Sequence, residues 1–300
     1  MKLVLSLLSN PSDHNMLSIA IIGDLHDWHS QQIESSLKKR GCRVIKLKFD
    51  ELQANFQRGK FFLNPELKKV KGVWLRFINN GTLEEITTKL TFLHLLEKVG
   101  VYIHNSPKTI EMTVDKVRTT GLLEIASINS PNTLVRIGEI KKLKKKNYLL
   151  KPIFGSQGKN ISFIKNKSNL SKTKPVGNVS YLQDFIGDLN QKKHWDVRVL
   201  VSNHRHVTSM KRSSKKILTN AYQGAILDEF DITDEIKKMC VKVSKLFKLG
   251  YGGIDIKKYK GKYYVLEVNS IPSWKAIQKT NKKNITEVLV NDFLKKLEKK

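Results

Sequence analysis

The chain has 300 residues, 40% of them apolar, so it can bury a core as one large domain or as two to three small lobes. No apolar run approaches the roughly 20 residues that a membrane-spanning helix needs. Two cysteines are too few for a disulfide framework or a zinc site. The composition therefore excludes a protein with helical membrane spans and a small disulfide-bonded scaffold.

The N-terminal 15 residues resemble a weak secretory signal. Their apolar run is short, however, and no small-x-small cleavage site precedes the strand-like residues 17–22. We therefore expect a cytoplasmic protein that does not associate with membranes.

The net charge of +28 at pH 7 comes mainly from lysine, because only nine of the 55 basic residues are arginines. A basic surface could bind nucleic acid phosphates or attract an acidic substrate. A general bias towards lysine on solvated faces explains the charge equally well, and no aromatic-interleaved basic motif typical of nucleic-acid platforms is present. A chain that uses lysine almost everywhere keeps arginine where a planar, bidentate donor is needed, which singles out Arg76, Arg198 and Arg212.

The N-terminal third alternates strand and helix patterns, which predicts a small parallel sheet with right-handed crossovers. The strands are expected at 19–22, 42–47, 72–77 and 101–104. A helix is expected at 29–40, and a second begins at a capping box formed by Thr82 and Glu85. Such sheets bind ligands beyond the carboxyl ends of their strands, where Arg76 and Asn105 would lie. No G-x-G-x-x-G is present, so a dinucleotide site is not expected.

The next segment contains two lysines that could bind an anion. A helix over 108–126 carries Lys116, which in such a position is more often only solvated. Lys151 lies in the apolar strand-like run YLLKPIF, where its charge is costly unless an anion meets it. The glycine loop GSQG, residues 155–158, could fold its N–H groups over phosphates, although G-x-x-G alone usually marks only a turn.

A first hairpin is expected over residues 196–212, after the strand-like run YLQDFI. With its turn near Arg205, Arg198 and Arg212 fall roughly opposite each other. Like charges that face each other across a sheet are destabilising, so a bound anion between them is one resolution. The alternative is a register shifted by one residue, with both arginines exposed. The following polar loop contains Asn220, and the amphipathic helix over 233–249 is expected to pack in the core.

The second hairpin, residues 253–269, predicts a metal site. Centring its turn on Gly261 places Asp255 opposite Glu267, and Asn269 shares the face of Glu267 because residues two apart on a strand point to the same side. Two carboxylates and an amide oxygen suit a hard cation such as Mg²⁺, held together with substrate phosphates. The alternative is a solvated edge hairpin whose acidic residues balance nearby lysines.

The order of these motifs resembles the ATP-grasp superfamily, and within it the RimK-like amino-acid ligases. The motifs are Ser-Pro…Asp-Lys, Lys-Pro-x-x-Gly-Ser-x-Gly, Gln-Asp-Phe-Ile, Asp-x-Arg, Arg…Thr-Asn and Asp…Glu-x-Asn. The resemblance implies an ATP-grasp fold of mixed α/β and α+β class. It implies a Rossmann-like pre-ATP-grasp lobe at 1–105, a lobe with the phosphate-covering loop at 106–180, and a C-terminal lobe with the metal site at 181–300. ATP would lie between the two α+β lobes.

The resemblance also implies a role for each candidate residue. Contacts with the phosphates would come from Lys116, Lys151, Gly155, Ser156, Gln157 and Gly158. Adenine would be held by backbone hydrogen bonds of Gln183, Asp184 and Phe185, and Asp196 would lie near the nucleoside. One or two Mg²⁺ ions, with Mn²⁺ as an alternative, would be held by Asp255, Glu267 and Asn269. The γ-phosphate and an acyl phosphate would be bound by the catalytic set Arg198, Arg212 and Asn220. Two departures from the family pattern are Asp184, where glutamate is common, and Leu218, where some members carry a basic residue.

The activity that this resemblance implies is an ATP-dependent carboxylate–amine ligase that forms an acyl phosphate and then an amide. The stretches Asp27-Trp28-His29 and Trp74-Leu75-Arg76-Phe77 look like those of the group that adds L-glutamate to tetrahydromethanopterin, a pterin. The expected partners are ATP, an amino acid and a small acidic acceptor, in a homo-oligomer. The alternatives are a ligase that acts on a ribosomal protein tail or an amino-group carrier protein and, from another class, a basic nucleic-acid-binding module.

Overall fold

The structure is a computed structural model that describes residues 16–57, 60–79, 81–155, 158–165, 167–171, 173, 175–219 and 221–299. The expectations for the N-terminal signal-like residues, for Ser156 and Gln157 and for Asn220 concern positions outside these ranges. Within them, no helix is long and apolar enough to cross a membrane. The chain divides into two compact units: unit 1 is Met1–Ser106 with Phe293–Lys300, and unit 2 is Pro107–Asp292.

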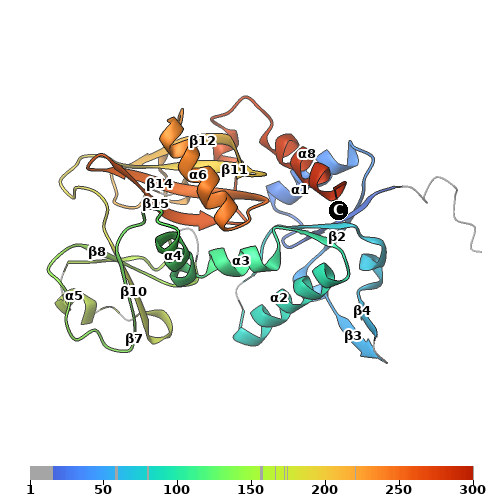
Figure 1. The fold of residues 1–300 in the computed structure, drawn as a ribbon, viewed down its shortest axis with the longest axis horizontal. Coiled ribbons are helices and arrows are strands. Elements are labelled where there is room, and N and C mark those ends of the chain that lie inside the picture. The colour runs from blue at the N-terminus through green and yellow to red at the C-terminus, as the bar shows by residue number, and fades with distance from the viewer. Residues whose placement is uncertain are drawn as a thin grey trace, which may run out of the picture. The chain divides into compact units, whose positions relative to one another are not determined.

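Unit 1 contains a four-stranded parallel sheet in the order β2-β1-β5-β6 (Figure 1). Its elements are β1 (Ser18–Ile22), α1 (Trp28–Lys38), β2 (Arg43–Leu47), β3 (Ala54–Gln57), β4 (Lys60–Leu63), β5 (Gly72–Leu75), α2 (Leu83–Lys98) and β6 (Tyr102–His104). Strands β1 and β5 are buried throughout, as expected for apolar runs in a parallel sheet. The predicted parallel sheet and the capping box of Thr82 and Glu85 are confirmed. The hairpin β3–β4 is an addition that the sequence pattern does not predict.

An aromatic cluster forms much of the core of unit 1. The ring of Trp74 lies 5.1 Å from that of Phe293 and 4.9 Å from that of His104. A Cβ atom at Gly72 would lie 2.8 Å from the Phe293 ring, so this close packing requires glycine. Burial, together with the charge of Lys296, lowers the pKa of His104 to about 3, which keeps the imidazole neutral. This histidine therefore serves the core rather than catalysis.

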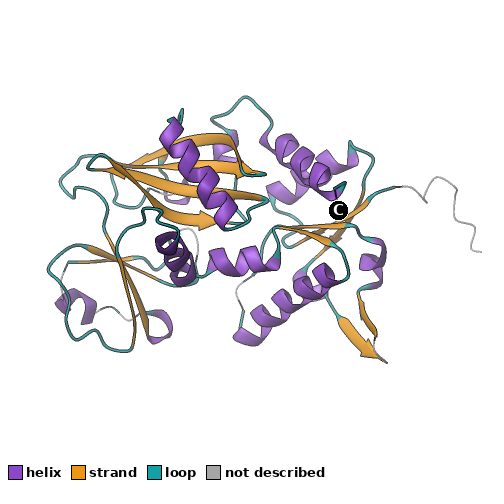
Figure 2. Ribbon diagram, in the orientation of Figure 1, coloured by secondary structure: helices purple, strands orange, loops and turns teal. Residues whose placement is uncertain are grey.

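Unit 2 contains two antiparallel sheets, visible as separate groups of orange strands in Figure 2. The small sheet has the order β7-β10-β8-β9 and the large sheet the order β13-β12-β11-β14-β15. The elements are α3 (Pro107–Val114), α4 (Lys116–Ile125), β7 (Thr133–Ile137), β8 (Tyr148–Lys151), β9 (Ser162–Ile164), α5 (Lys167–Ser171), β10 (Val179–Asp184), β11 (His194–Ser202), β12 (Arg205–Ser214), β13 (Ile226–Glu229), α6 (Asp234–Leu246), β14 (Tyr251–Tyr259), β15 (Lys262–Asn269), α7 (Lys275–Gln278) and α8 (Ile285–Leu297). Helix α8 passes from unit 2 into unit 1 at Phe293.

The large sheet is apolar on one face and charged on the other. Val197, Val199, Ile254 and Ile256 pack in one buried cluster with the apolar side of α6, which crosses the sheet in Figure 1. Because side chains alternate along a strand, the residues between these positions point to the opposite face. That face carries the predicted ionic residues of β11 and β14. The amphipathic helix expected at 233–249 packs in the core, and this prediction is confirmed.

Two expected boundaries differ from the structure. The single helix predicted over 108–126 is wrong, because Asp115 adopts an extended conformation and caps a second helix by accepting hydrogen bonds from the N–H groups of Val117 and Arg118. The expected lobe boundary between residues 180 and 181 falls inside β10, which pairs with β7 and β8. Strand β10 thus stays with the small sheet.

Candidate active site

The hairpin of β14 and β15 places Asp255 opposite Glu267, as the sequence predicts. Its turn is formed by Lys260 and Gly261, both with positive φ, and a β-bulge interrupts the ladder between Asp255 and Ile256. Asn269 lies two residues beyond Glu267 and pairs with Gly253. The three candidate metal-binding side chains thus lie at neighbouring positions of two adjacent strands.

Asp255 is only 4% exposed, and two arginines bind it. Arg198 donates from Nε and Nη2 to its two carboxylate oxygens at 2.7 Å each, and Arg212 Nη2 lies 3.0 Å from Oδ2. Burial opposes the charged form of Asp255, but the two guanidinium groups outweigh it and hold its pKa well below the usual range. The carboxylate is therefore ionised at neutral pH.

The expected pairing of Arg198 with Arg212 is wrong. Arg198 faces Met210, and Arg212 faces Asp196. The turn is formed by Asn203 and His204 rather than lying near Arg205, and the register shifts by one residue between Leu200 and Val201. The structure shows neither a pair of facing arginines with a bound anion between them nor a pair of exposed arginines. The arginines are not exposed, and the anion that lies against both is the carboxylate of Asp255.

Asp196 belongs to the same ionic network. Its carboxylate accepts hydrogen bonds from Arg212 Nε at 2.6 Å and Nη2 at 2.9 Å, and also from the hydroxyl of Thr219. Burial raises the pKa of Asp196, although the guanidinium of Arg212 opposes that rise. Thr219, the residue before Asn220, belongs to this network although no sequence pattern assigns it a role.

Two lysines approach the hairpin from the neighbouring elements. Lys116 Nζ, at the start of α4, donates to the carbonyl of Gly155 at 3.0 Å and lies 3.9 Å from Glu267 Oε1. Lys151 Nζ, at the end of β8, donates to Gln183 Oε1 at 2.6 Å. Burial lowers the pKa of Lys151 to about 8; the charge of Lys116 adds to this effect, and those of Glu267 and Asp255 oppose it. Two ammonium groups thus lie near the hairpin, and their binding of phosphates stays a prediction.

The glycine loop begins directly after these contacts. Gly155 has a φ of +157°, and a Cβ atom there would lie 3.0 Å from Pro152. Gly158 also has a positive φ of 68°. These conformations favour glycine, so the local backbone explains why a glycine stands at each end of the loop.

The segment Gln183–Asp184–Phe185 joins the small sheet to the loop that follows it. The N–H groups of Asp184 and Phe185 donate to the carbonyls of Asn132 and Asn147, at 2.8 and 3.0 Å. Asp184 Oδ2 accepts from Lys146 Nζ at 2.6 Å. Since these two N–H groups have partners within the protein, hydrogen bonds from this segment to a base would have to use other backbone groups.

Lys257 is a residue at this site that the sequence analysis does not identify. It is 7% exposed, and its ammonium lies 5.6 Å from the centroid of the Phe185 ring. Burial lowers the pKa of Lys257, and the charge of Asp196 opposes that shift. Its position two residues after Asp255 is the signal that could have identified it, because alternate residues share a face.

The donor set fits a hard cation held together with phosphates. Glu267 is 35% exposed and accessible, and the buried Nδ2 of the Asn269 amide has no hydrogen-bond partner among the described residues. Within the ranges that the structure describes, no three His, Cys, Asp or Glu side chains cluster so that they could hold a metal. The residues therefore supply two carboxylates and an amide, and the remaining ligands of an ion would come from a substrate and water.

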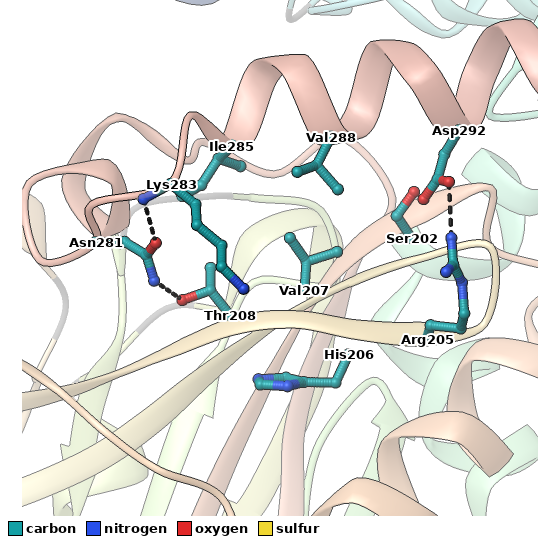
Figure 3. A pocket seen from close by; sticks show the side chains of 10 residues that line it. All are labelled: Ser202, Arg205, His206, Val207, Thr208, Asn281, Lys283, Ile285, Val288 and Asp292. Carbon is teal, nitrogen blue, oxygen red and sulfur yellow. Dashed lines mark hydrogen bonds and ion pairs between the residues drawn. The ribbon is translucent and has the colours of Figure 1, made fainter.

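A separate pocket of about 180 Å³ lies at the other end of β11 and β12 (Figure 3). One side contains the ion pair between Arg205 and Asp292, at 2.7 Å, and the other contains Asn281, which donates to Thr208 at 2.6 Å. None of the candidate site residues lines it. Its charged groups therefore do not contribute to the site described above.

Residues 113–293, more than half of the chain, match the RimK-like ATP-grasp domain. The chain belongs to the RimK-like ATP-grasp family. This RimK-like protein is 27% identical over 294 residues to the tetrahydromethanopterin:alpha-L-glutamate ligase of Methanococcus maripaludis, with 93% of this chain and 98% of that protein covered. It is 30% identical to the coenzyme gamma-F420-2:alpha-L-glutamate ligase of Methanocaldococcus jannaschii, with 66% of this chain and 73% of that protein covered.

The solved structure of the ATP-grasp ligase PsnB, complexed with a phosphomimetic variant of its minimal precursor, Mg and ADP, has a TM-score of 0.70 to this chain. The two are 20% identical, and the comparison covers 94% of this chain and 99% of that one. The predicted ATP-grasp fold is therefore confirmed. As a RimK-like ATP-grasp protein, the chain is an ATP-dependent ligase that forms carbon–nitrogen bonds.

Proposed function

We propose that this ligase adds L-glutamate to a small acidic acceptor such as a pterin cofactor. The observation that carries the proposal is the group of charges around the β14–β15 hairpin. Two arginines bind Asp255, Lys116 lies 3.9 Å from Glu267, and the charges of both carboxylates act on Lys151. The similarity to glutamate ligases over 93% of the chain supports the choice of amino acid and acceptor. The positive net charge suits a polyanionic acceptor.

The proposed reaction has two steps. A carboxylate oxygen of the acceptor attacks the γ-phosphorus of ATP, which forms an acyl phosphate and releases ADP. The amino nitrogen of glutamate then attacks the acyl carbon, which forms the amide and releases phosphate and the amine proton. Neither step needs a covalent bond to the protein, so the residues act by aligning the reactants and stabilising charge.

In this proposal each charged group has a defined partner. Lys116 and Lys151 bind the phosphates of ATP, and the loop from Gly155 to Gly158 covers them. Arg198 and Arg212 lie beside the transferred phosphoryl group, where their charges stabilise the negative charge that develops. Magnesium held by Asp255, Glu267 and Asn269 would neutralise phosphate charge.

Unit 1, taken by itself, has a second set of polar groups at a position where open sheets bind ligands. The strand order places the topological switch point between β1 and β5, and ligands of open α/β sheets bind beyond such a point. Asp27 caps α1 there, and Arg76 Nε lies 4.0 Å from its carboxylate. The buried guanidinium of Arg76 suits recognition of an acidic group on a ligand of this unit.

The test is a product analysis with purified protein, ATP, Mg²⁺ and glutamate. The acceptors should include a pterin with a carboxylate side chain, an acidic peptide and an amino-group carrier protein. We expect release of ADP and phosphate and a product heavier by one or more glutamate residues only with the pterin. Product formation on the peptide or the carrier protein alone would contradict the proposed acceptor while leaving the ligase activity intact.

The low pKa of Lys151 predicts an alkaline limit on nucleotide use. As pH rises through about 8, its ammonium loses a proton and a positive charge is lost from the phosphate site. We therefore expect kcat/KM for ATP to fall about tenfold per pH unit above this value. The Lys151→Arg variant keeps its charge, so its pH profile should lack this alkaline limb, the fall of kcat/KM above a pH of about 8. An identical alkaline limb in that variant would assign the titration to another group.

Lys257 is predicted to contribute to nucleotide affinity. Its ammonium lies beside Phe185, and we expect Lys257→Met to raise the KM for ATP about tenfold through loss of a donor to the nucleoside, with kcat little changed. Lys258→Met is the matched control, because Lys258 is the exposed neighbour. Equal KM values for the two variants would exclude Lys257 from the nucleotide site.

A further inference from the structure

A chain of hydrogen bonds leads from α4 through β10 to Lys151. Thr120 Oγ1 lies 2.6 Å from the hydroxyl of Tyr181, which accepts a hydrogen bond from Gln183 Nε2 at 3.1 Å. Gln183 Oε1 in turn accepts from Lys151 Nζ at 2.6 Å. Tyr181 and Gln183 are each only 2% exposed. The Gln183 side chain therefore points into the protein, where it bridges a hydroxyl and an ammonium.

Both ends of the Gln183 amide have a partner, and this fixes its orientation. A reversed amide would set its NH₂ group against the ammonium of Lys151, two groups that can only donate. The tyrosine hydroxyl accepts from the amide nitrogen and so holds the carbonyl towards the lysine. One of the three ammonium donors of Lys151 is thereby fixed in direction, and the described residues provide no hydrogen-bond acceptor for the other two.

The partner of Lys151 is neutral, and this matters for the charge of the site. Lys151 is largely desolvated, and its charge is held near Lys116 on α4, Glu267 on β15 and Asp255 on β14. An amide carbonyl supports the ammonium without cancelling its charge, whereas a carboxylate at the same position would neutralise it. Gln183 thus supports the ammonium without adding a negative charge to the site.

We propose that Gln183 is a positioning residue that, through the Thr120–Tyr181–Gln183 chain, holds the ammonium of Lys151 in the direction of the nucleotide phosphates. The inference rests on the proposed function, since it takes Lys151 as a phosphate ligand. It gives Gln183 a role through its side chain, distinct from the backbone contacts with adenine that the family resemblance implies.

The test compares Gln183→Leu with Gln183→Glu. Loss of the acceptor in Gln183→Leu should lower kcat/KM for ATP about tenfold or more, with the KM for glutamate unchanged, and should move the alkaline limb of the pH profile to lower pH. The carboxylate of Gln183→Glu should move that limb to higher pH, because it stabilises the ammonium. Opposite shifts of the limb would not result from a merely structural role.

Tyr181→Phe removes the group that orients the amide and should shift the limb in the direction of Gln183→Leu, by a smaller amount. Tyr148→Phe is its matched control, since Tyr148 is a buried tyrosine of the adjacent strand whose hydroxyl donates to the carbonyl of Lys144. If the glutamine and Tyr181 variants keep the wild-type limb and KM, the positioning role is refuted.

Titration of the Lys151 side chain by nuclear magnetic resonance separates the two proposals, because it does not depend on turnover. We expect the pKa of Lys151 to fall in Gln183→Leu and to rise in Gln183→Glu. Lys151→Met serves as the reference for nucleotide binding. If it binds ATP as tightly as the wild type, the phosphate role of Lys151 fails and the inference about Gln183 fails with it. If Lys151→Met weakens ATP binding and Gln183→Leu does not, the proposed function stands and the positioning role alone is lost.

Discussion

The Glu267→Gln variant is expected to lose ligase turnover while it keeps its fold. The side chain is 35% exposed and lies 3.9 Å from Lys116 Nζ, an ion pair that contributes little to stability at such exposure. The reaction, in contrast, loses one of the two carboxylates available to a magnesium ion on the phosphates. We expect kcat to fall by about two to three orders of magnitude or more, measured as ADP release at saturating substrate.

The control for this variant is Glu229→Gln. Glu229 is an exposed carboxylate on β13, in the same sheet, and carries no proposed role. Both variants should unfold at the wild-type temperature, and only Glu267→Gln should lose activity. Normal turnover in Glu267→Gln would refute the assignment of Glu267 to the metal site.

The predicted register of the β14–β15 hairpin is confirmed for a reason that the sequence does not contain. The turn is formed by Lys260 and Gly261, and from there the ladder would place Asp255 opposite Leu266. The bulge after Asp255 adds one residue on β15 and brings Glu267 into place. A bulge depends on packing around the strand, so alternation of side chains alone cannot predict it.

The β11–β12 hairpin shows the opposite outcome. Asn203 and His204 form its turn with positive φ, a conformation that asparagine tolerates, whereas the sequence analysis centred the turn on Arg205. A turn at Asn203 and His204 would by itself place Arg212 opposite Trp195, and a register shift between Leu200 and Val201 brings it opposite Asp196. Hairpin register follows turn geometry so closely that an error of this size changes every cross-strand partner.

The kinds of residue in the site could be predicted from the sequence, but their partners could not. Lysines, arginines and carboxylates in an apolar context indicate anion and metal chemistry wherever they occur. The three-strand contact of Arg198, Arg212 and Asp255 depends on the register of the β11–β12 hairpin together with the β11–β14 pairing, in which Arg198 lies opposite Asp255. The same holds for Lys257, whose neighbour Phe185 comes from the loop after the small sheet. Such contacts join segments far apart in sequence and need the fold.

Asp255→Ala is expected to destabilise the protein as well as to inactivate it. The carboxylate lies against two guanidinium groups, and its loss leaves the charge of Arg198 without this partner in a buried site. Removing one member of a buried ion pair costs about 3 to 5 kcal/mol, which lowers Tm by roughly 10 °C for a unit of this size. Thermal unfolding followed by circular dichroism measures the change.

The same ion pairs also make stability depend on pH. The pKa of Asp255 is lower in the folded than in the unfolded state, so its contribution is complete above the ordinary value of 3.8 and is lost as pH falls below it. Asp255→Ala should therefore differ most from the wild type near neutral pH, and the two should converge in acid. Glu267→Ala is the control, since it removes a carboxylate of the same site whose partner Lys116 lies 3.9 Å away and keeps hydrogen bonds to the carbonyls of Ile153 and Gly155.

A second substitution tests the cause of this destabilisation. If the unpaired guanidinium of Arg198 is responsible, adding Arg198→Met to Asp255→Ala should recover part of the lost stability, because an apolar chain of similar length replaces a buried charge. Arg212 keeps Asp196 as a partner in both variants, so it provides no comparable relief. An Asp255→Ala variant that melts at the wild-type temperature would show that the carboxylate does not hold the three strands together, and the ionic network would then have a role in catalysis alone.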